Sequence, residues 1–255
     1  MRLKNKVVIV TGGGQGIGQA IAMGLAAEGA AVVIGQRHAD RAEGVAKDII
    51  AKGGKAIGTH LDISTQAPCD AIVKLAKEQF GGLDILVNNA ALYGDIDFKR
   101  WSDWTEEEWA NSFNINVVGG WRMTKAAVPL IRERGRGKIV NISSATVHQG
   151  FHGLLPYTSS KAAVISNTRG LAKSLGRYNI TVNCLAIGYV ATDASLKMAS
   201  YSEAGEKALI AMRAIQRRQV AEDQVGTVLY FVTDESDFVT GQCVCVDGGT
   251  EFTGM

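Results

Sequence analysis

The chain has 255 residues, of which 46% are hydrophobic, and its formal net charge is +2. This composition supplies enough apolar side chains for a large core. A nearly neutral chain without a long basic block gives no reason to expect nucleic-acid binding. No apolar stretch approaches the ~18 residues of a transmembrane helix, so the sequence also argues against a membrane-spanning protein.

Two further features bear on the cellular compartment. The N-terminal segment MRLKNKVVIVTGG lacks the longer apolar region and the cleavage site of a signal peptide. The four cysteines, Cys69, Cys184, Cys243 and Cys245, form no paired C-x-x-C clusters. We therefore interpret them as buried thiols rather than as disulfides or zinc ligands, and we expect a cytoplasmic protein.

The first predicted element is a buried strand, because residues 6–10 form a short β-branched run. It leads into TGGGQGIG at residues 11–18, and a helical pattern follows to about residue 28. Glycines allow a tight turn and a close approach of a pyrophosphate, and the helix N-terminus supplies unpaired N–H groups. The order of strand, turn and helix therefore predicts a phosphate-binding site, although the glycine spacing differs from G-x-G-x-x-G. A glycine-rich turn without a ligand is the alternative.

The second predicted strand, AVVIG at residues 31–35, should end beside the adenosine ribose of a dinucleotide. NAD-binding proteins commonly have Asp or Glu there, whereas this chain has Gln36 and Arg37. No carboxylate would repel a 2′-phosphate, and Arg37 can pair with one, but Gln15 in the glycine-rich turn adds no second cation. We expect NAD(P) with a preference for NADP. A solvent-exposed loop arginine is the alternative for Arg37.

The next predicted elements are a helix and two strands, at residues 41–52, 55–60 and 83–87. Asp62 follows the first of these strands, where it can contact an adenine ring or cap the helix that starts near residue 66. The second strand runs into the segment NNAA at residues 88–91. Small and amide residues at this end of a strand suit a backbone that lies against a cofactor.

A capping box of Thr105 and Glu108 begins the middle helix, which is predicted to extend through Ile131. An apolar run at residues 139–142 then predicts a buried strand, and two serines follow it directly. The second of them, Ser144, can hold a substrate oxygen.

Tyr157 and Lys161 occur four residues apart in a run with helical spacing, so they share one face of a helix. The ordinary pKa of a phenol is ~10, and a nearby ammonium lowers it. A tyrosine adjusted in this way can exchange a proton with a substrate oxygen. For an isolated Y-x-x-x-K motif, a surface tyrosine beside a solvated lysine is the more common outcome, so this interpretation depends on the rest of the chain.

The loop between Ser144 and Tyr157 is expected to line an apolar substrate pocket, to which Phe151 contributes. His148 and His152 are four residues apart and can bind a metal on a helix, but no further ligand set is evident. We therefore predict no metal site.

The last predicted elements are a strand at residues 180–186, a helix at 220–232 and a strand at 243–246. Alternation along the final strand places Cys243 and Cys245 on one face, where we expect core residues. The mixed segment at about residues 191–218 is expected to form a lid over the substrate, an element whose composition varies widely.

No repeat or linker interrupts this order. Residues 1–255 are therefore predicted to form a single doubly wound α/β domain of the Rossmann type, with a parallel seven-stranded sheet flanked by helices. The handedness of the crossovers should bring Ser144 and the glycine-rich turn together at the carboxyl edge of the sheet.

The segments TGGGQGIG, NNAA and YTSSK, in this order and spacing, resemble the short-chain dehydrogenase/reductase family over nearly the whole chain. The family pattern T-G-x-x-x-G-x-G falls on residues 11–18, and T-G-Q and D-G-G near the end also match. Two positions depart from the pattern. Ala91 replaces the glycine of N-N-A-G, and Ile187 replaces the proline of a P-G pair, which removes a backbone constraint.

The resemblance implies roles for individual residues. Asn116, Ser144, Tyr157 and Lys161 would be catalytic, with Asn116 holding a proton-relaying water and Lys161 also binding the nicotinamide ribose. The cofactor would contact Gly12, Gln15, Gly16, Ile17, Gly18, Gln36, Arg37, Asp62, Ile63, Asn89, Ala90, Tyr157, Lys161, Ile187, Gly188, Val190 and Thr192. The substrate pocket would include Ser144, Thr146, Phe151, Tyr157 and Tyr189.

The implied activity is an NAD(P)-dependent interconversion of a secondary alcohol and a ketone by hydride transfer. A 3-oxoacyl thioester reductase and a sugar or polyol dehydrogenase are alternatives within the family. A dinucleotide-binding sensor without catalytic activity is a non-enzyme alternative, against which the presence of both Tyr157 and Lys161 argues. The expected partners are a small-molecule substrate and further copies of the chain, since family members are commonly tetramers.

Overall fold

The computed structural model describes residues 1–93, 96–196 and 202–252. Its centre is a parallel seven-stranded sheet in the order β3-β2-β1-β4-β5-β6-β7. The strands are β1 (Val7–Thr11), β2 (Ala31–Gln36), β3 (Lys55–His60), β4 (Ile85–Asn88), β5 (Gly137–Ser144), β6 (Ile180–Ile187) and β7 (Cys243–Val246). This confirms the predicted parallel sheet of a doubly wound, Rossmann-type fold. Each strand boundary lies within about two or three residues of its predicted position.

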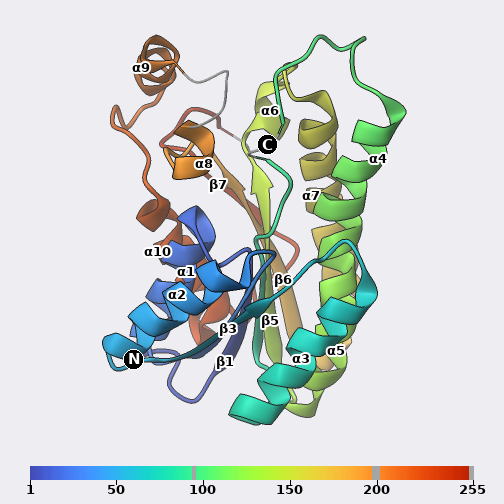
Figure 1. The fold of residues 1–255 in the computed structure, drawn as a ribbon, viewed down its shortest axis with the longest axis vertical. Helices are drawn as coiled ribbons and strands as arrows, with labels where there is room; N and C mark the ends of the chain where they lie inside the picture. Colours follow the sequence, from blue (N-terminus) through green and yellow to red (C-terminus); the bar gives the residue numbers. More distant parts are fainter. Residues whose placement is uncertain (94–95, 197–201, 253–255) are drawn as a thin grey trace.

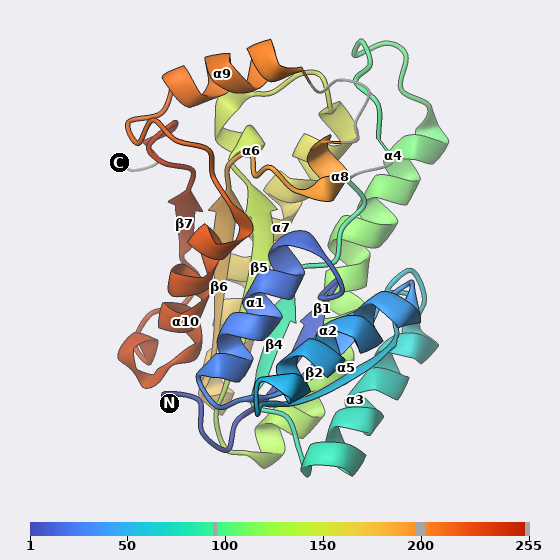
Figure 2. The ribbon, with the colours of Figure 1, turned by 60° about the vertical axis from the view of Figure 1, so that its left-hand side comes forward.

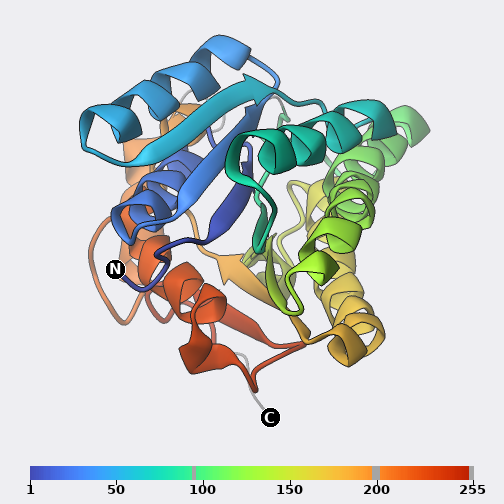
Figure 3. The same ribbon diagram turned by 90° about the horizontal axis from the view of Figure 1, so that it is seen from below.

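Helices cover both faces of this sheet (Figures 1 and 3). One layer contains α1 (Gly16–Ala27), α2 (Ala39–Ala51) and α10 (Val225–Val232), and the other contains α3 (Gln66–Phe80), α5 (Gly120–Glu133) and α7 (Leu155–Leu175). Two layers explain why β1 and β5 are buried along their whole length, since neither face of these strands meets water. Among the described helices, none combines the length and apolarity needed to cross a bilayer.

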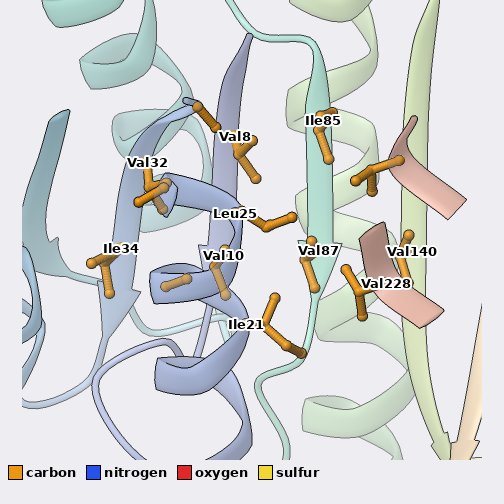
Figure 4. Packing of buried hydrophobic residues seen from close by; sticks show 14 of the residues in the cluster. Val8, Val10, Ile21, Leu25, Val32, Ile34, Ile85, Val87, Val140 and Val228 are labelled. Atoms are coloured by element: carbon orange, nitrogen blue, oxygen red, sulfur yellow. The ribbon is translucent and has the colours of Figure 1, made fainter. Parts of the chain in front are cut away.

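The hydrophobic core follows from these two layers. In Figure 4, Ile21 and Leu25 of α1 point onto Val10 of β1 and Val87 of β4, at the centre of the sheet. Ile21, Leu25, Val10 and Val87 are each 0% exposed. The apolar face of α1 therefore holds this helix directly over β1 and β4. Helix α1 is the helix that follows the glycine-rich turn.

Short helices gather above the carboxyl ends of the strands (Figures 1 and 2). They are α6 (Thr146–Gln149), α8 (Asp193–Leu196) and α9 (Glu203–Ala211), while 3₁₀ turns span Gly176–Tyr178, Ala221–Gln224 and Asp234–Ser236. The helix predicted at residues 220–232 therefore consists of two parts, a 3₁₀ turn at Ala221–Gln224 and then α10. The lid predicted at residues 191–218 includes positions 197–201, which lie outside the described residues.

The middle helix is interrupted rather than continuous. Its capping box is confirmed, because Thr105 Oγ1 accepts a hydrogen bond from Glu108 N while Glu108 accepts one from Thr105 N. Helix α4 (Glu106–Phe113) then passes into a π-helical segment, Asn114–Gly119, before α5 begins. A π-helical turn is wider than an α-helical turn and often marks a functional site.

The final strand corrects one expectation. Cys243 and Cys245 are partly buried rather than core residues. The reason is that β7 is an edge strand that pairs only with β6 in the described sheet, so its side chains are less completely covered.

Two glycines beside α2 give a matched stability test. A Cβ at Gly58 of β3 would lie 2.3 Å from backbone atoms of Ala42 and Glu43, whereas nothing lies within 4 Å of a Cβ at Gly44. Gly58→Ala must push α2 away from the sheet, and we expect the free energy of unfolding to fall by ~1–3 kcal/mol. Gly44→Ala should raise it by ~0.5–1 kcal/mol because alanine favours a helix. Urea denaturation of both variants measures the free energy of unfolding. Equal changes in this free energy for the two variants would contradict the close packing of α2 on β3.

Candidate active site

The glycine-rich turn is held by hydrogen bonds from the end of β4. Thr11 Oγ1 accepts from the backbone N–H groups of Asn89 and Ala90, both at 3.0 Å. The Asn89 side chain donates to the carbonyls of Thr11 and Gly12 at 3.0 and 3.1 Å. Since β1 and β4 are adjacent at the point where the strand order reverses, the turn lies at the topological switch point of the sheet.

Two glycines of the turn are required by geometry. Gly12 has a φ of 65°, in the left-handed region that L side chains rarely adopt. A Cβ at Gly18 would lie 2.2 Å from the Gly12 carbonyl oxygen. Helix α1 therefore packs directly on the turn, and its N-cap residue, Gln15, makes no side-chain capping bond. The N–H groups of the first turn of α1 are left without a capping side chain, which suits an anion.

Polar residues surround the end of β2 beside this turn. Arg41, in the first turn of α2, donates a hydrogen bond to the side chain of Gln15. Arg37 lies close enough to Asp62 to help lower the pKa of that carboxyl, although the larger cause is a hydrogen bond from Ser64 N. Gln36 is the last residue of β2. Sequence reasoning missed Arg41, although its position four residues after Arg37 was an available signal.

The Asp62 side chain is held in a local turn. Its Oδ1 accepts a hydrogen bond from Ser64 N at 2.8 Å. Asp62 is therefore not the N-cap residue of the helix that begins at residue 66. Thr65 is the N-cap residue of α3. Ile63 beside it is buried against the π-helical segment, where a Cβ at Gly119 would lie 2.7 Å from the Ile63 side chain.

Ser144, Tyr157 and Lys161 converge where β5 ends and α7 begins. Ser144 Oγ accepts from Thr146 Oγ1 at 2.9 Å, and Ser144 lies close enough to Tyr157 to affect the pKa of its phenol. Lys161 Nζ donates to the carbonyl of Ile142 at 2.9 Å and lies 5.6 Å from the centre of the Tyr157 ring. Tyr157 and Lys161 are 8% and 3% exposed. The alternative of a surface tyrosine beside a solvated lysine is therefore wrong.

The electrostatics of this group differ from the sequence expectation. Burial raises the pKa of Tyr157, the neighbouring Tyr93 adds to the rise, and the Ser144 side chain opposes it. Burial also lowers the pKa of Lys161 to about 8. The expectation that the lysine lowers the phenol pKa is wrong, because the net shift of the Tyr157 pKa is upward. Desolvation disfavours both the phenolate and the ammonium, and it outweighs their mutual attraction.

Asn116 connects the π-helical segment to α7. Its Oδ1 accepts from Leu92 N at 2.7 Å, and its Nδ2 donates to Ser160 Oγ at 2.9 Å. Ser160 Oγ in turn donates to the carbonyl of Tyr157 at 2.7 Å. Asn116 is thus a buried, hydrogen-bonded residue at the interruption of the middle helix, and Asn114 instead accepts a bond from Arg122.

A small hollow of about 30 Å³ lies beside Lys161 and Asn116. Its lining includes Asn88, Asn116, Asn141, Trp121, Lys161 and Asn167. Trp121 is 47% exposed, which marks the open end of the hollow. Polar side chains therefore extend from Lys161 towards the surface.

Tyr157 has an aromatic neighbour, and a second aromatic pair includes Phe151 of the loop before α7. The rings of Tyr93 and Tyr157 are 5.2 Å apart, and those of Phe98 and Phe151 are 5.3 Å apart. Burial raises the pKa of Tyr93 to about 12, with a smaller contribution from Tyr189. Phe151 and Tyr189 were predicted pocket residues, whereas Tyr93 was missed because nothing in its sequence neighbourhood distinguishes it.

The loop after β6 approaches the glycine-rich turn. Gly188 N donates to Val246 O at 3.0 Å, which ties the loop to β7. A Cβ at Gly16 would lie 3.3 Å from Thr192 Cγ2, so Thr192 lies against the turn. Ile187 and Val190 are buried at 5% exposure each. The structure thus brings together four segments of the predicted site, from β1, β4, β5 with α7, and the loop after β6.

Comparisons with known proteins agree with this geometry. A protein-family model described as "Enoyl-(Acyl carrier protein) reductase" matches residues 12–251. "Dehydrogenase/reductase SDR family member 4" of Oryctolagus cuniculus is 38% identical over 97% of this chain and 94% of its own length. Galactitol 2-dehydrogenase of Agrobacterium fabrum is 37% identical, over 98% of each chain.

A solved structure from Sinorhizobium meliloti 1021, assigned to the short-chain alcohol dehydrogenases, superposes with a TM-score of 0.91 at 30% identity and covers 97% of both chains. The glycine-rich turn clamped by β4 and the buried serine, tyrosine and lysine occur within a chain that matches these proteins along almost its whole length. The chain belongs to the short-chain dehydrogenase/reductase family of oxidoreductases, which use NAD or NADP.

Proposed function

We propose that the chain is an NADP-preferring enzyme that interconverts a secondary alcohol and a ketone, with Tyr157 as the acid and base. The observation that carries the proposal is the convergence of Ser144, Tyr157 and Lys161 in a buried site at the carboxyl end of β5. Such an arrangement can hold one substrate oxygen and exchange a proton with it.

The residues present fit a dinucleotide. The uncapped N-terminus of α1, with Gly12, Gly16, Ile17 and Gly18, would receive the pyrophosphate. Further contacts would come from Asp62, Ile63, Asn89, Ala90, Ile187, Gly188, Val190 and Thr192, which line the same edge of the sheet. Lys161 would bind the nicotinamide ribose. The bound nicotinamide would supply or accept the hydride, while the protein orients the reactants and moves the proton.

The preference for NADP rests on the residues at the end of β2. Gln36 and Arg37 replace the carboxylate that would repel a 2′-phosphate. Arg41 adds a second guanidinium, which donates a hydrogen bond to Gln15. The sequence analysis did not predict this contact. Two guanidinium groups at one edge of the adenosine site would favour the additional phosphate.

The proton is expected to move between Tyr157 and the substrate oxygen. Because burial raises the pKa of Tyr157, its hydroxyl is protonated at neutral pH and ready to donate to a ketone oxygen. Ser144 would hold the same oxygen. In the oxidation of an alcohol the phenolate must form first, and the Lys161 ammonium would stabilise it. Asn116, at the hollow beside Lys161, would hold a water that returns the proton.

The substrate class is expected to follow from the walls of the pocket. Phe151 and the neighbouring Phe98 supply apolar surface, whereas Thr146 and Tyr189 supply hydroxyl groups. The apolar wall favours a secondary alcohol with a ring. A polyol is the second candidate, and the 37% identity with a galactitol 2-dehydrogenase supports it. Residues 191–218 would form a lid over this pocket.

We further infer that residues 1–255 act as one domain, that the protein works in the cytoplasm and that it forms a homotetramer through the middle helices and the last strand. Apolar side chains on these elements support the tetramer. Trp121 of α5 is 47% exposed, Val244 of β7 is 40% exposed and Phe238 just before β7 is fully exposed.

Tyr157→Phe removes the proton donor and acceptor but keeps the ring. We expect turnover of a ketone to fall by ~10²–10⁴-fold, the usual contribution of a positioned acid or base, with the dissociation constant of NADPH unchanged. Steady-state kinetics and fluorescence titration measure the two quantities. Tyr230→Phe, at a half-exposed tyrosine of α10, is the control and should retain full activity. Normal turnover by the Tyr157 variant would refute the assignment.

The lowered pKa of Lys161 predicts a pH dependence. The amine is protonated below its pKa of about 8 and neutral above it. Because the ammonium supports proton delivery through Tyr157, kcat/KM for ketone reduction should be constant below pH ~7 and fall up to tenfold per pH unit above ~8. Initial rates between pH 6 and 10 test this. A profile that stays flat to pH 10 would show that Lys161 does not titrate in this range.

Arg37→Ala tests cofactor preference without any turnover. Loss of a guanidinium that pairs with the 2′-phosphate should raise the dissociation constant of NADPH by ~10-fold and leave that of NADH nearly unchanged, since a charge-assisted hydrogen bond contributes ~1.5–3 kcal/mol. Arg41→Ala should act in the same direction. Lys52→Ala, an exposed cation at the other end of α2, is the matched control. Equal losses for both cofactors would remove the case for NADP.

A further inference from the structure

Two cysteines face each other across the last pair of strands. Cys184 of β6 and Cys243 of β7 are register partners in the parallel sheet. Side chains of register partners project from the same face, and both cysteines pack beside Val164 and Ile165 of α7. Neighbouring strands are ~4.8 Å apart, which lies within the range of ~4.4–6.8 Å between the Cα atoms of a disulfide.

The two thiols differ in the properties that decide reactivity. Cys243 is partly exposed, and its pKa is lowered, first by a hydrogen bond from Cys184 and further by the Arg169 guanidinium. Cys184 is 0% exposed, and the shared hydrogen bond and burial raise its pKa. An accessible, more acidic thiol therefore lies directly beside a buried thiol. Oxidation-sensitive cysteines share this arrangement, in which the first thiolate is oxidised to a sulfenic acid and the second thiol resolves it to a disulfide.

We propose that Cys184 and Cys243 form an oxidisable dithiol that closes to a disulfide when the protein meets a peroxide. The Cys243 thiolate attacks one oxygen of hydrogen peroxide, the O–O bond breaks, and a sulfenic acid and hydroxide form. The Cys184 sulfur then attacks the Cys243 sulfur and displaces the hydroxyl group, which leaves as water with the Cys184 proton. In total, two thiols and one peroxide give one disulfide and two waters. A dithiol reductant reverses the change by thiol–disulfide exchange.

The remaining cysteines lack this arrangement and serve as internal controls. Cys69 of α3 is buried, its Sγ donates to the Thr65 carbonyl, and burial raises its pKa to about 11. Cys245 lies opposite Ala186, so the register gives it no cysteine on β6. The sequence could not distinguish these four thiols, because the strand pairing decides which two of them meet.

The position of the pair connects it to the active site. Cys184 lies close enough to Lys161 to affect the pKa of that lysine. The strand β7 also carries the Val246 carbonyl that holds Gly188 at the start of the loop after β6. A disulfide would fasten the edge strand to β6 beside these elements.

The test uses the full-length protein with hydrogen peroxide in modest excess, followed by intact-mass measurement and peptide mapping without reduction. The wild type should lose 2 Da, reversibly with dithiothreitol, and yield one cross-linked peptide pair that contains Cys184 and Cys243. Cys184→Ala should instead gain 16 or 32 Da at Cys243, and Cys243→Ser should show no change over the same time. Cys69→Ser and Cys245→Ser should still lose 2 Da.

Circular dichroism establishes that each variant is folded before oxidation. Because Cys184 is buried, Cys184→Ser provides a second variant at that position if the alanine variant does not fold. Progression of Cys243 in the wild type to a sulfinic acid without any 2 Da loss would overturn the proposal. A disulfide that maps to another pair, or persists in Cys184→Ala or Cys243→Ser, would overturn it as well.

Discussion

The hydrogen bond from Lys161 Nζ to the carbonyl of Ile142 joins the start of α7 to the middle of the sheet. Both groups are buried, so the bond is made where water does not compete, and an unpaired ammonium there would be costly. It fixes the face of α7 that carries Tyr157 against the end of β5, where Ser144 lies. Ser143 of β5 also holds α7, because its hydroxyl donates to the Lys161 carbonyl at 2.8 Å. The orientation of the tyrosine is therefore a consequence of how this helix docks on this strand.

A second set of contacts fixes the cofactor side of the site. Thr11 and Asn89 exchange hydrogen bonds between the ends of β1 and β4, and the absence of side chains at Gly12 and Gly18 lets α1 approach the turn. The side chains of the proposed site thus gather at the strand ends, with Tyr157 near the end of β5 and the glycine-rich turn at the end of β1.

Burial has opposite consequences for the groups of this site. It keeps the Tyr157 phenol protonated and makes the Lys161 ammonium easier to deprotonate, because both charged forms lose hydration. The π-helical segment directs the Asn116 amide towards Leu92 N and Ser160 Oγ, which belong to other parts of the chain.

Short apolar runs with a regular spacing, separated by turns that contain glycine, were sufficient to predict the strands, their parallel arrangement and most helices. This succeeded because buried parallel strands are continuously apolar and each is followed by a helix. The resemblance to a known family, rather than periodicity, indicated the residues of the turn, Ser144, Tyr157 and Lys161 as candidate site residues. Boundaries moved by a few residues and the middle helix proved interrupted, because end positions depend on capping and side-chain bonds that spacing does not encode.

The sequence by itself determined which chemical groups the site contains and at which edge of the sheet they gather. Only the tertiary structure decided their electrostatic state, since desolvation depends on what covers a group, and so the direction of the Tyr157 pKa shift came out opposite to the expectation. It likewise decided that Arg41 reaches Gln15, that the tilted Tyr93 ring lies beside that of Tyr157 and that Cys184 pairs in register with Cys243. Each of these contacts joins residues from different elements, and their distance is set by packing and strand register rather than by any local pattern.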